Sequence, residues 1–409
     1  MKDNALRIKK LPLWKRNLIA VWVTQFMSLL GFAFCVPVLP YYIQELGVTS
    51  PDMIKLYTGL MSAVPAISLG IMAPIWGNLA DRFGKKIMMV RAMFFAFIVL
   101  FLLGLAQNVN QVLMIRLMQG LFTGTVAASY ALVAAGTPDE NMSYAIGILS
   151  SSIFIGNSAG LAVGGIVADL VGYRTSFLIG SAVMLAGLAF VMVFVKEIKS
   201  GETVDSGDGK IKVKSSIKAL LPVASVVLSM IFMIRIARTL TDPYIPIYIQ
   251  EIRNTLTGSA TISGLIRAFS SIATAVAGIF IVRLGDRMDR FKLSAVLLTL
   301  GALLAIPMFL VRDLVVFTIM NFLVFLAIGG VDPIMSSQAS LMVKSENRGV
   351  LFGLITMVGS FGWAVSPLIG SFVTIRFSTT AIFAAFSILM AFSAVMSYVI
   401  YIARRKKSE

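Results

Sequence analysis

The chain has 409 residues, of which 58% are hydrophobic and only 13% charged, and its mean hydropathy is +0.90. Soluble domains are typically about 45 to 50% apolar, so this composition excludes an ordinary soluble protein and predicts one that crosses a membrane several times. Histidine is absent and Cys35 is the only cysteine, which excludes histidine-based acid–base catalysis, a disulfide within the chain and most metal sites. No metal and no cofactor is therefore expected.

Twelve apolar runs along the chain are long enough to cross a bilayer as helices. The first run continues past about 25 residues, so it is expected to stay in the protein rather than to be removed as a signal peptide. The predicted fold class is an all-α membrane protein with twelve transmembrane helices in two six-helix halves. The expected spans are 17–44, 53–79, 88–107, 110–135, 142–169, 174–196, 217–250, 257–282, 291–311, 314–341, 348–375 and 379–403.

The distribution of basic residues predicts the orientation of these spans. Twelve spans place both termini on one side of the membrane, and 25 of the 35 Lys and Arg lie on that side if it also holds the even-numbered turns. Cytoplasmic loops are enriched in Lys and Arg, so both termini are expected in the cytoplasm, with the protein in a plasma or bacterial inner membrane. The net charge of +16 then suits anionic lipid headgroups rather than nucleic acid.

The only long polar interval, 197–216, separates two similar halves. Pro37 and Pro40 recur as Pro243 and Pro246, 206 residues later in the chain. The expected domains are an N-terminal six-helix half at 1–196, a cytoplasmic linker at 197–216 and a C-terminal six-helix half at 217–409. Parallel repeats of this kind are typical of secondary transporters, whose substrate site lies between the halves.

A short basic loop joins the second and third spans. It reads GNLADRFGKK from Gly77, and a related sequence, DRMDR, begins 205 residues after Asp81, at Asp286. This loop resembles the signature loop of the major facilitator superfamily, and within it that of the twelve-helix drug:proton antiporters. The resemblance covers essentially the whole chain. It implies a gating role for charges that brace a neighbouring helix end and release it in a conformational switch, whereas a plain positive-inside turn is the alternative. The predicted gating residues are Gly77, Asp81, Arg82, Gly84 and Lys85.

Two more motifs carry the same resemblance. The sequence LG at Leu30, followed after five residues by PVLP at Pro37, resembles the helix 1 signature of the twelve-helix exporters, and its prolines are expected to loosen the helix. The sequence RLMQG at Arg116 resembles a motif that the family associates with proton coupling. A lone guanidinium inside a span must face a polar interior, so an Arg that only ties helices together is the alternative.

The fifth span matches the antiporter signature incompletely. It reads GNSAGLAVGG from Gly156, with Leu161 where the signature has proline, and the corresponding second-half position does carry Pro367. Small residues at this spacing permit close packing of helices. Gly156, Gly160, Gly164 and Pro367 are therefore expected helix-packing positions. The motif does not fix the direction of transport, because its proline is missing.

Ionisable residues inside the spans are the candidates for function. Asp242 and Asp332 are the two deep acids, and with Arg116 they are predicted to couple protons. A buried carboxylate that alternates between water and an Arg partner changes its protonation as its surroundings open and close. Because Arg238 lies four residues before Asp242, simple neutralisation within a salt bridge is the alternative reading for that acid.

Arginine outnumbers aspartate inside the spans by four to two. Arg235, Arg238 and Arg267 are predicted to bind substrate, since desolvated guanidinium groups favour carboxylate or phosphate. The alternative is that Arg235 or Arg267 lines water or extends toward the membrane surface.

These features predict a proton-coupled secondary transporter that exports lipophilic or amphiphilic small molecules by alternating access, as in multidrug efflux, with a preference for anionic or zwitterionic compounds. Its expected partners are that substrate, protons and membrane lipids, and a monomer is expected. The alternative is an importer or facilitator-type carrier of an anionic metabolite, siderophore or lipid. The lack of histidine disfavours a membrane-embedded enzyme.

Overall fold

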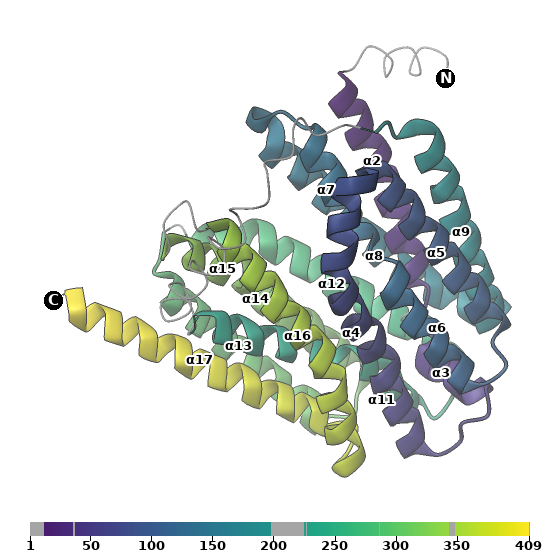
Figure 1. Cartoon of the computed structure of the whole chain (residues 1–409). Helices are drawn as coiled ribbons and strands as arrows, with labels where there is room; N and C mark the ends of the chain where they lie inside the picture. The colour runs from purple at the N-terminus through teal and green to yellow at the C-terminus, as the bar shows by residue number, and fades with distance from the viewer. Residues whose placement is uncertain are drawn as a thin grey trace. The chain divides into compact units, whose positions relative to one another are not determined.

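The computed structural model describes residues 12–35, 37–197, 225, 227–285, 287–342 and 348–408, which form helices joined by short turns (Figure 1). Ten helical runs in this part of the chain are long and apolar enough to cross a membrane. They coincide with the expected spans 2 to 6 and 8 to 12. The prediction of an all-α protein that crosses the membrane many times is therefore confirmed.

The first and seventh expected spans are broken helices. Helix α2 (Leu13–Ala33) ends before Pro37, and α3 (Leu39–Glu45) follows it. In the seventh span, residues 227–240 are helical, and a 3₁₀ turn (Asp242–Tyr244) then leads into α11 (Ile245–Arg253). Proline has no N–H to donate and crowds the preceding turn, so Pro37 and Pro243 account for the two breaks. Residues 217–224 of the seventh span lie outside the described part of the chain.

The described helices fall into two compact units. The first unit holds α2, α3, α5 (Lys85–Leu105), α6 (Val109–Phe122), α7 (Thr125–Gly136), α8 (Met142–Val171), α9 (Tyr173–Phe194), residues 67–83 of α4 (Pro51–Phe83) and residues 260–268 of α12 (Ser259–Leu284). The second unit holds the rest of α4 and α12, the helix at 227–240, α11, α13 (Arg290–Leu310), α14 (Leu314–Ile328), α15 (Val331–Leu341), α16 (Arg348–Arg376) and α17 (Ala381–Ser408).

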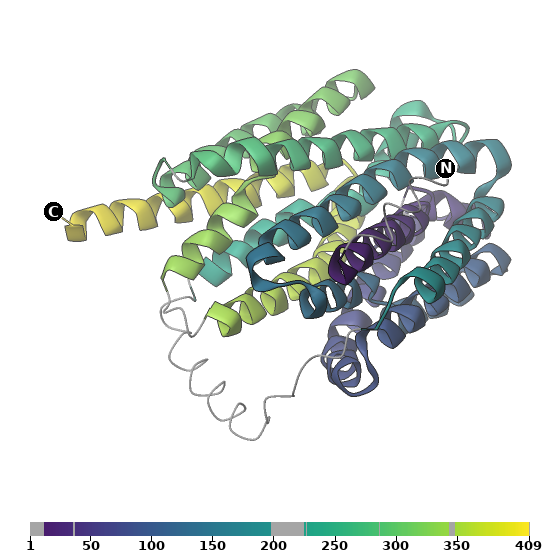
Figure 2. The same cartoon turned by 90° about the horizontal axis from the view of Figure 1, so that it is seen from above.

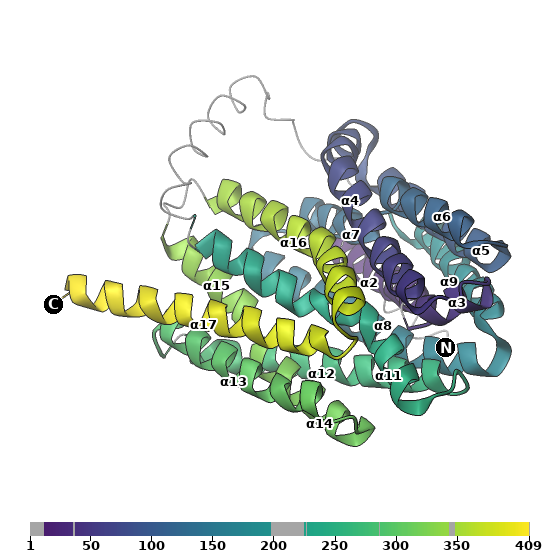
Figure 3. The ribbon, with the colours of Figure 1, turned by 90° about the horizontal axis from the view of Figure 1, so that it is seen from below.

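Each unit is held together by a few long helix pairs. In the first unit, α2 packs against both α8 and α9, and α5 packs against α9. In the second unit, α13 packs against α14 and runs along α17, the yellow helix at the C-terminus in Figure 2 and Figure 3. These pairs bury the apolar side chains that face away from lipid.

A buried tyrosine ties the broken first span to its neighbours in the first unit. The Tyr42 hydroxyl donates to the carbonyl oxygens of Leu103 and Ala106, at 2.8 and 3.1 Å. Leu103 lies in the last turn of α5 and Ala106 directly follows the helix, where carbonyl oxygens lack their usual helical N–H partner four residues on. The Tyr42 ring also meets the edge of Phe177, with the ring centroids 5.0 Å apart.

The second unit repeats this arrangement. The Tyr248 hydroxyl donates to the carbonyl oxygens of Met308 and Val311, at 3.4 and 3.3 Å, and its ring meets Phe383 with the centroids 5.0 Å apart. Every one of these residues lies 205 or 206 positions after its counterpart in the first unit. The duplication that the sequence predicts is thus present in the three-dimensional structure.

The fourth and tenth spans are also interrupted, at corresponding positions. Helix α6 ends at Phe122, and α7 begins after Gly124, whose φ of 105° suits a residue without a Cβ. Helix α14 ends at Ile328, and α15 begins after Gly330, 206 residues beyond Gly124. Non-helical backbone at membrane depth is tolerated where it is buried in protein or lines a water-filled cavity. Five of the charged candidates lie in these four interrupted spans: Arg116, Arg235, Arg238, Asp242 and Asp332.

Candidate functional site

An ion pair in the second unit joins two of the residues singled out by the sequence. Arg235, on the helix at 227–240, donates from Nε to Asp332 Oδ1 at 3.2 Å and from Nη2 to Asp332 Oδ2 at 3.1 Å. Such side-on, two-point pairing is among the stronger polar contacts in proteins. The side chains of Arg235 and Asp332 retain 29% and 20% exposure, so the pair is not fully enclosed by protein.

The local sequence places Asp332 at the start of a helix. It lies in the first turn of α15, which begins at Val331 directly after Gly329 and Gly330, and it precedes Pro333. Pro333 cannot donate the helical hydrogen bond that would join it to the preceding turn, so the span breaks at the glycines. Both glycines approach α12 closely, because a Cβ on Gly329 would lie 2.8 Å from the Ala277 side chain. The N-terminus of a helix favours a carboxylate there.

Arg238 and Asp242 join Arg235 and Asp332 in a cluster of four charged residues. Arg238 lies within electrostatic range of Asp332, Asp242 and Arg235, and both Arg238 and Asp242 are partly exposed. The helix that carries Arg238 ends at residue 240, and Asp242 belongs to the following 3₁₀ turn. Two Arg and two Asp give the cluster a formal charge of zero when both acids are ionised.

The other two candidate arginines belong to the first unit. Arg116, on α6, is buried with 8% exposure and donates from Nη1 to Gln119 Oε1 at 2.6 Å. It lies within electrostatic range of Cys35, which is 1% exposed at the break of the first span. Arg267 is partly exposed on the part of α12 that packs within the first unit. Arg235 and Arg238 therefore lie together in the second unit, whereas Arg267 lies in the first.

The basic loop that joins the second and third spans is very short. Helix α4 ends at Phe83, Gly84 adopts a φ of 101°, and α5 begins at Lys85. Gly77 and Arg82 are exposed. Asp81 belongs to the last turn of α4 and its side chain lies outside the described part of the chain, as does Asp286 in the second-half counterpart.

Glu197, which the sequence pattern did not indicate, binds the backbone of this loop. The Glu197 carboxylate accepts from the backbone N–H groups of Lys85 and Lys86, both at 3.0 Å. The first turn of α5 contains no acid of its own, and an acid near a helix N-terminus is stabilising. Asn17 in turn holds the segment that carries Glu197, because the Asn17 side-chain amide exchanges hydrogen bonds of 2.9 and 3.0 Å with the backbone of Lys196.

The three glycines of the fifth span lie where α8 passes α2. A Cβ on Gly156 would lie 2.7 Å from the carbonyl oxygen of Phe26, and one on Gly160 would lie 2.6 Å from the Ala33 side chain. Gly164 approaches the backbone of Phe34 just as closely. Any side chain at these positions would push the two helices apart.

Leu161 and Pro367, the corresponding residues of the two halves, play different roles. Leu161 is 3% exposed and packs with Ala33 and Ala268 inside the first unit, where α8 runs without interruption. Pro367 lies inside α16, and its carbonyl oxygen accepts a 2.6 Å hydrogen bond from the Tyr244 hydroxyl. Helices α8 and α16 both continue past this position, so Pro367 does not interrupt its helix.

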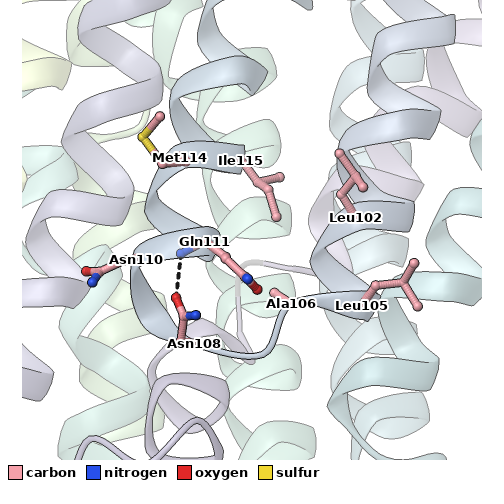
Figure 4. Close-up of a pocket in the computed structure, with 8 residues that line it drawn as sticks. All are labelled: Leu102, Leu105, Ala106, Asn108, Asn110, Gln111, Met114 and Ile115. Atoms are coloured by element: carbon pink, nitrogen blue, oxygen red, sulfur yellow. Dashed lines mark hydrogen bonds between the residues drawn. The ribbon is translucent and has the colours of Figure 1, made fainter.

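A cavity of about 480 Å³ opens between the end of α5 and the start of α6 (Figure 4). Its wall contains none of the candidate charged residues. Among its lining residues, Asn108 Oδ1 accepts from the backbone N–H of Gln111 at 2.9 Å. The lining residues are Leu102, Leu105, Ala106, Asn108, Asn110, Gln111, Met114 and Ile115.

The sequence is similar to a known family over almost its whole length. The family model described as Major Facilitator Superfamily matches residues 21–254 and again residues 227–409. A relative from Lactococcus lactis subsp. lactis (strain IL1403), named multi-drug resistance efflux pump PmrA homolog, is 30% identical over 392 residues, which cover 94% of this chain and 95% of the relative. The multidrug resistance protein MdtG of Klebsiella pneumoniae (strain 342) is 30% identical over 388 residues, which cover 94% and 93%.

Solved structures share the fold at low sequence identity. A bacterial homologue of the human lysosomal transporter Spinster superposes with a TM-score of 0.75 at 13% identity, covering 95% of this chain and 97% of that one. The nucleoside transporter NupG superposes with a TM-score of 0.74 at 14% identity, covering 93% and 98%. At these identities the likeness concerns the fold alone.

Proposed function

We propose, from the premise that this chain belongs to the Major Facilitator Superfamily, that it exports lipophilic or amphiphilic small molecules across a cell membrane in exchange for protons. Two relatives at 30% identity are named as multidrug efflux or resistance proteins, and this supports the substrate class. The observation that carries the proposal is the partly exposed pair of Arg235 and Asp332 beside the break of the tenth span.

The pair supplies a proton-binding step. While Asp332 is ionised, it pairs with Arg235 and the four-charge cluster is neutral. A proton on Asp332 removes one negative charge and leaves the cluster with a formal charge of +1. Because unpaired charge is costly in a poorly solvated site, the protonated form favours a conformation that exposes Arg235 to water. Alternation between these two forms is the basis of coupling in this proposal.

The formal charge of the cluster also links the charge of a substrate to the direction in which it is transported relative to protons. A cation is repelled by the protonated cluster and tolerated by the neutral one, so protons and cations exclude each other, as exchange requires. An anion is attracted to the protonated cluster and would move together with the proton. The anionic preference expected from Arg235, Arg238 and Arg267 therefore belongs to the alternative function, proton-driven import of an anionic metabolite, siderophore or lipid.

The remaining assignments belong to the same proposal. Arg116 supports proton coupling from the first unit, and Arg82, Gly84 and Lys85, with Gly77 and Asp81, form the loop that switches between conformations. Both termini and the linker at 197–216 lie in the cytoplasm. The two halves at 1–196 and 217–409 move against each other within one monomer embedded in lipid, and the chain performs transport rather than enzymatic chemistry.

Purified protein in liposomes tests this function directly. Three fluorescent compounds of similar size serve as probes: ethidium as a lipophilic cation, Nile red as a neutral compound and anilinonaphthalene sulfonate as an anion. We expect a pH gradient to drive ethidium in the direction opposite to protons, and ethidium added without a gradient to displace protons. Liposomes without protein are the control for passive leakage.

Two outcomes would contradict the export proposal. If only the anion moves, and in the same direction as protons, the importer is the better description. If no probe responds to a pH gradient while each exchanges freely across the membrane, the protein is a facilitator and the proton step is wrong.

A further inference from the structure

Gly359, on α16, lies directly against the Arg235 side chain of the Arg235–Asp332 pair. Gly359 is buried, and a Cβ built on it would overlap Nη1 of Arg235 and would lie 2.5 Å from Cζ and 2.7 Å from Cδ. The guanidinium therefore lies directly against Gly359, with its Nη1 and Cδ side toward α16. It donates to Asp332 from its other edge, through Nε and Nη2.

This placement restricts the movement of the guanidinium on the side of α16. Side-on pairing requires the planar group to face both carboxylate oxygens at once, and the α16 backbone blocks rotation on the opposite side. Any side chain at 359 would have to push the guanidinium away. The end of a long side chain moves more easily than packed backbone, so the expected result is a displaced Arg235 in a folded protein.

We propose that Gly359 is a positioning residue for proton coupling: by lacking a side chain, it lets α16 hold Arg235 in two-point contact with Asp332. The proposal rests on the proposed function for its consequence in transport, but not for its structural basis. It also assigns α16 a part in coupling, although its described segment carries no acid.

The same helix offers a matched control. Gly362 lies one turn further along α16 and is also buried, but a Cβ there would meet Phe232 at 3.3 Å and Arg235 only at Cβ, at 3.5 Å. Alanine at Gly362 thus tests the packing of the same two helices without touching the guanidinium.

The first experiment measures transport in liposomes with ethidium as the probe. We expect Gly359→Ala to lower ethidium-dependent proton flux by about tenfold, equivalent to about 1.4 kcal/mol, while ethidium exchange without a pH gradient stays within about twofold of wild type. Gly362→Ala is expected to preserve both. Normal proton flux in Gly359→Ala, or equal loss of flux and exchange, would overturn the positioning role.

A second experiment does not depend on transport. Melting temperatures are compared for wild type, Gly359→Ala, Arg235→Ala and the double variant in detergent. The methyl group that Gly359→Ala introduces would clash with the Arg235 guanidinium, which Arg235→Ala removes. We therefore expect Gly359→Ala to destabilise the wild type but to have no further effect in the Arg235→Ala background. Equal destabilisation in both backgrounds would show that Gly359 serves backbone packing alone. This result also stands if wild type proves not to move protons.

Discussion

Asp332 lies in the first turn of a helix, is paired with an Arg and is partly exposed. The helix N-terminus and the Arg favour its ionised form, so loss of the Arg contact would favour uptake of a proton. We expect Asp332→Asn to abolish accumulation driven by a pH gradient, because asparagine cannot take up and release the proton. Exchange of ethidium without a gradient should persist. Both rates are measured with the purified variant in liposomes.

Asp313→Asn is the control for that variant. Asp313 caps the start of α14 through hydrogen bonds of 2.9 and 2.8 Å to backbone N–H groups, and asparagine can make the same cap. Its substitution removes an acid at the start of the span that holds Asp332, without touching Arg235. A pH-driven gradient in Asp332→Asn as large as in wild type would exclude the coupling role.

Sequence reasoning identified Arg235 and Asp332 but assigned them to different tasks. Local spacing favoured Arg238 with Asp242, whereas the ion pair of Arg235 joins residues 97 positions apart. Such a contact depends on which faces of two distant helices meet, and one sequence does not contain that information. Gly359 has no chemical group that could have pointed to it. Glu197 could have been suspected only because the first turn of α5 lacks an acid.

At the scale of helices, the duplicated tyrosines allow a comparison between the units. Tyr42→Phe and Tyr248→Phe each remove a hydroxyl that bonds two carbonyls at the end of a helix. We expect each to destabilise the protein by about 1 to 3 kcal/mol, the cost of leaving buried polar groups without partners. Tyr42→Phe should cost more, because its hydrogen bonds are shorter. Thermal unfolding in detergent measures the difference, and equal shifts would contradict this ranking.

Leu161 allows a test of what the missing proline changes in α8. We expect Leu161→Pro to destabilise the protein by about 3 kcal/mol or more, since proline removes a backbone hydrogen bond and crowds the preceding turn of a continuous helix. It also removes a side chain packed against Ala33 and Ala268. Leu161→Met keeps the apolar volume and the backbone bond and is the matched control. A proline variant as stable as wild type would show that α8 is already loosened at this point.

The sequence predicted helices better than it predicted their interruptions. Prolines announced the breaks in the first and seventh spans. The breaks before Thr125 and Val331 fall at Gly124 and Gly330. Pro333 lies close after the second break, whereas the first has only its glycine. Glycine is common inside membrane helices and by itself does not indicate an interruption. Their equivalent positions in the two halves become informative only once the structure shows both.

At the scale of the whole molecule, the charge distribution predicts which side faces the cytoplasm. We expect green fluorescent protein fused after residue 409 to fluoresce, and alkaline phosphatase fused after Arg312 to be active, because the first reporter folds in the cytoplasm and the second outside it. Arg312 lies in the turn between α13 and α14, among the few basic residues expected on the outer face. The opposite pair of activities would invert the orientation.

The buried Cys35 makes the natural protein a convenient subject for spectroscopy. It is the only thiol in the chain and is 1% exposed, so thiol reagents should leave it unmodified under mild conditions. Cysteines introduced in pairs at exposed positions, one in each compact unit, can then carry spin labels without prior removal of a native residue. Distances between such labels, recorded with and without ethidium at several pH values, would follow the transport cycle in a protein whose own sequence is otherwise intact.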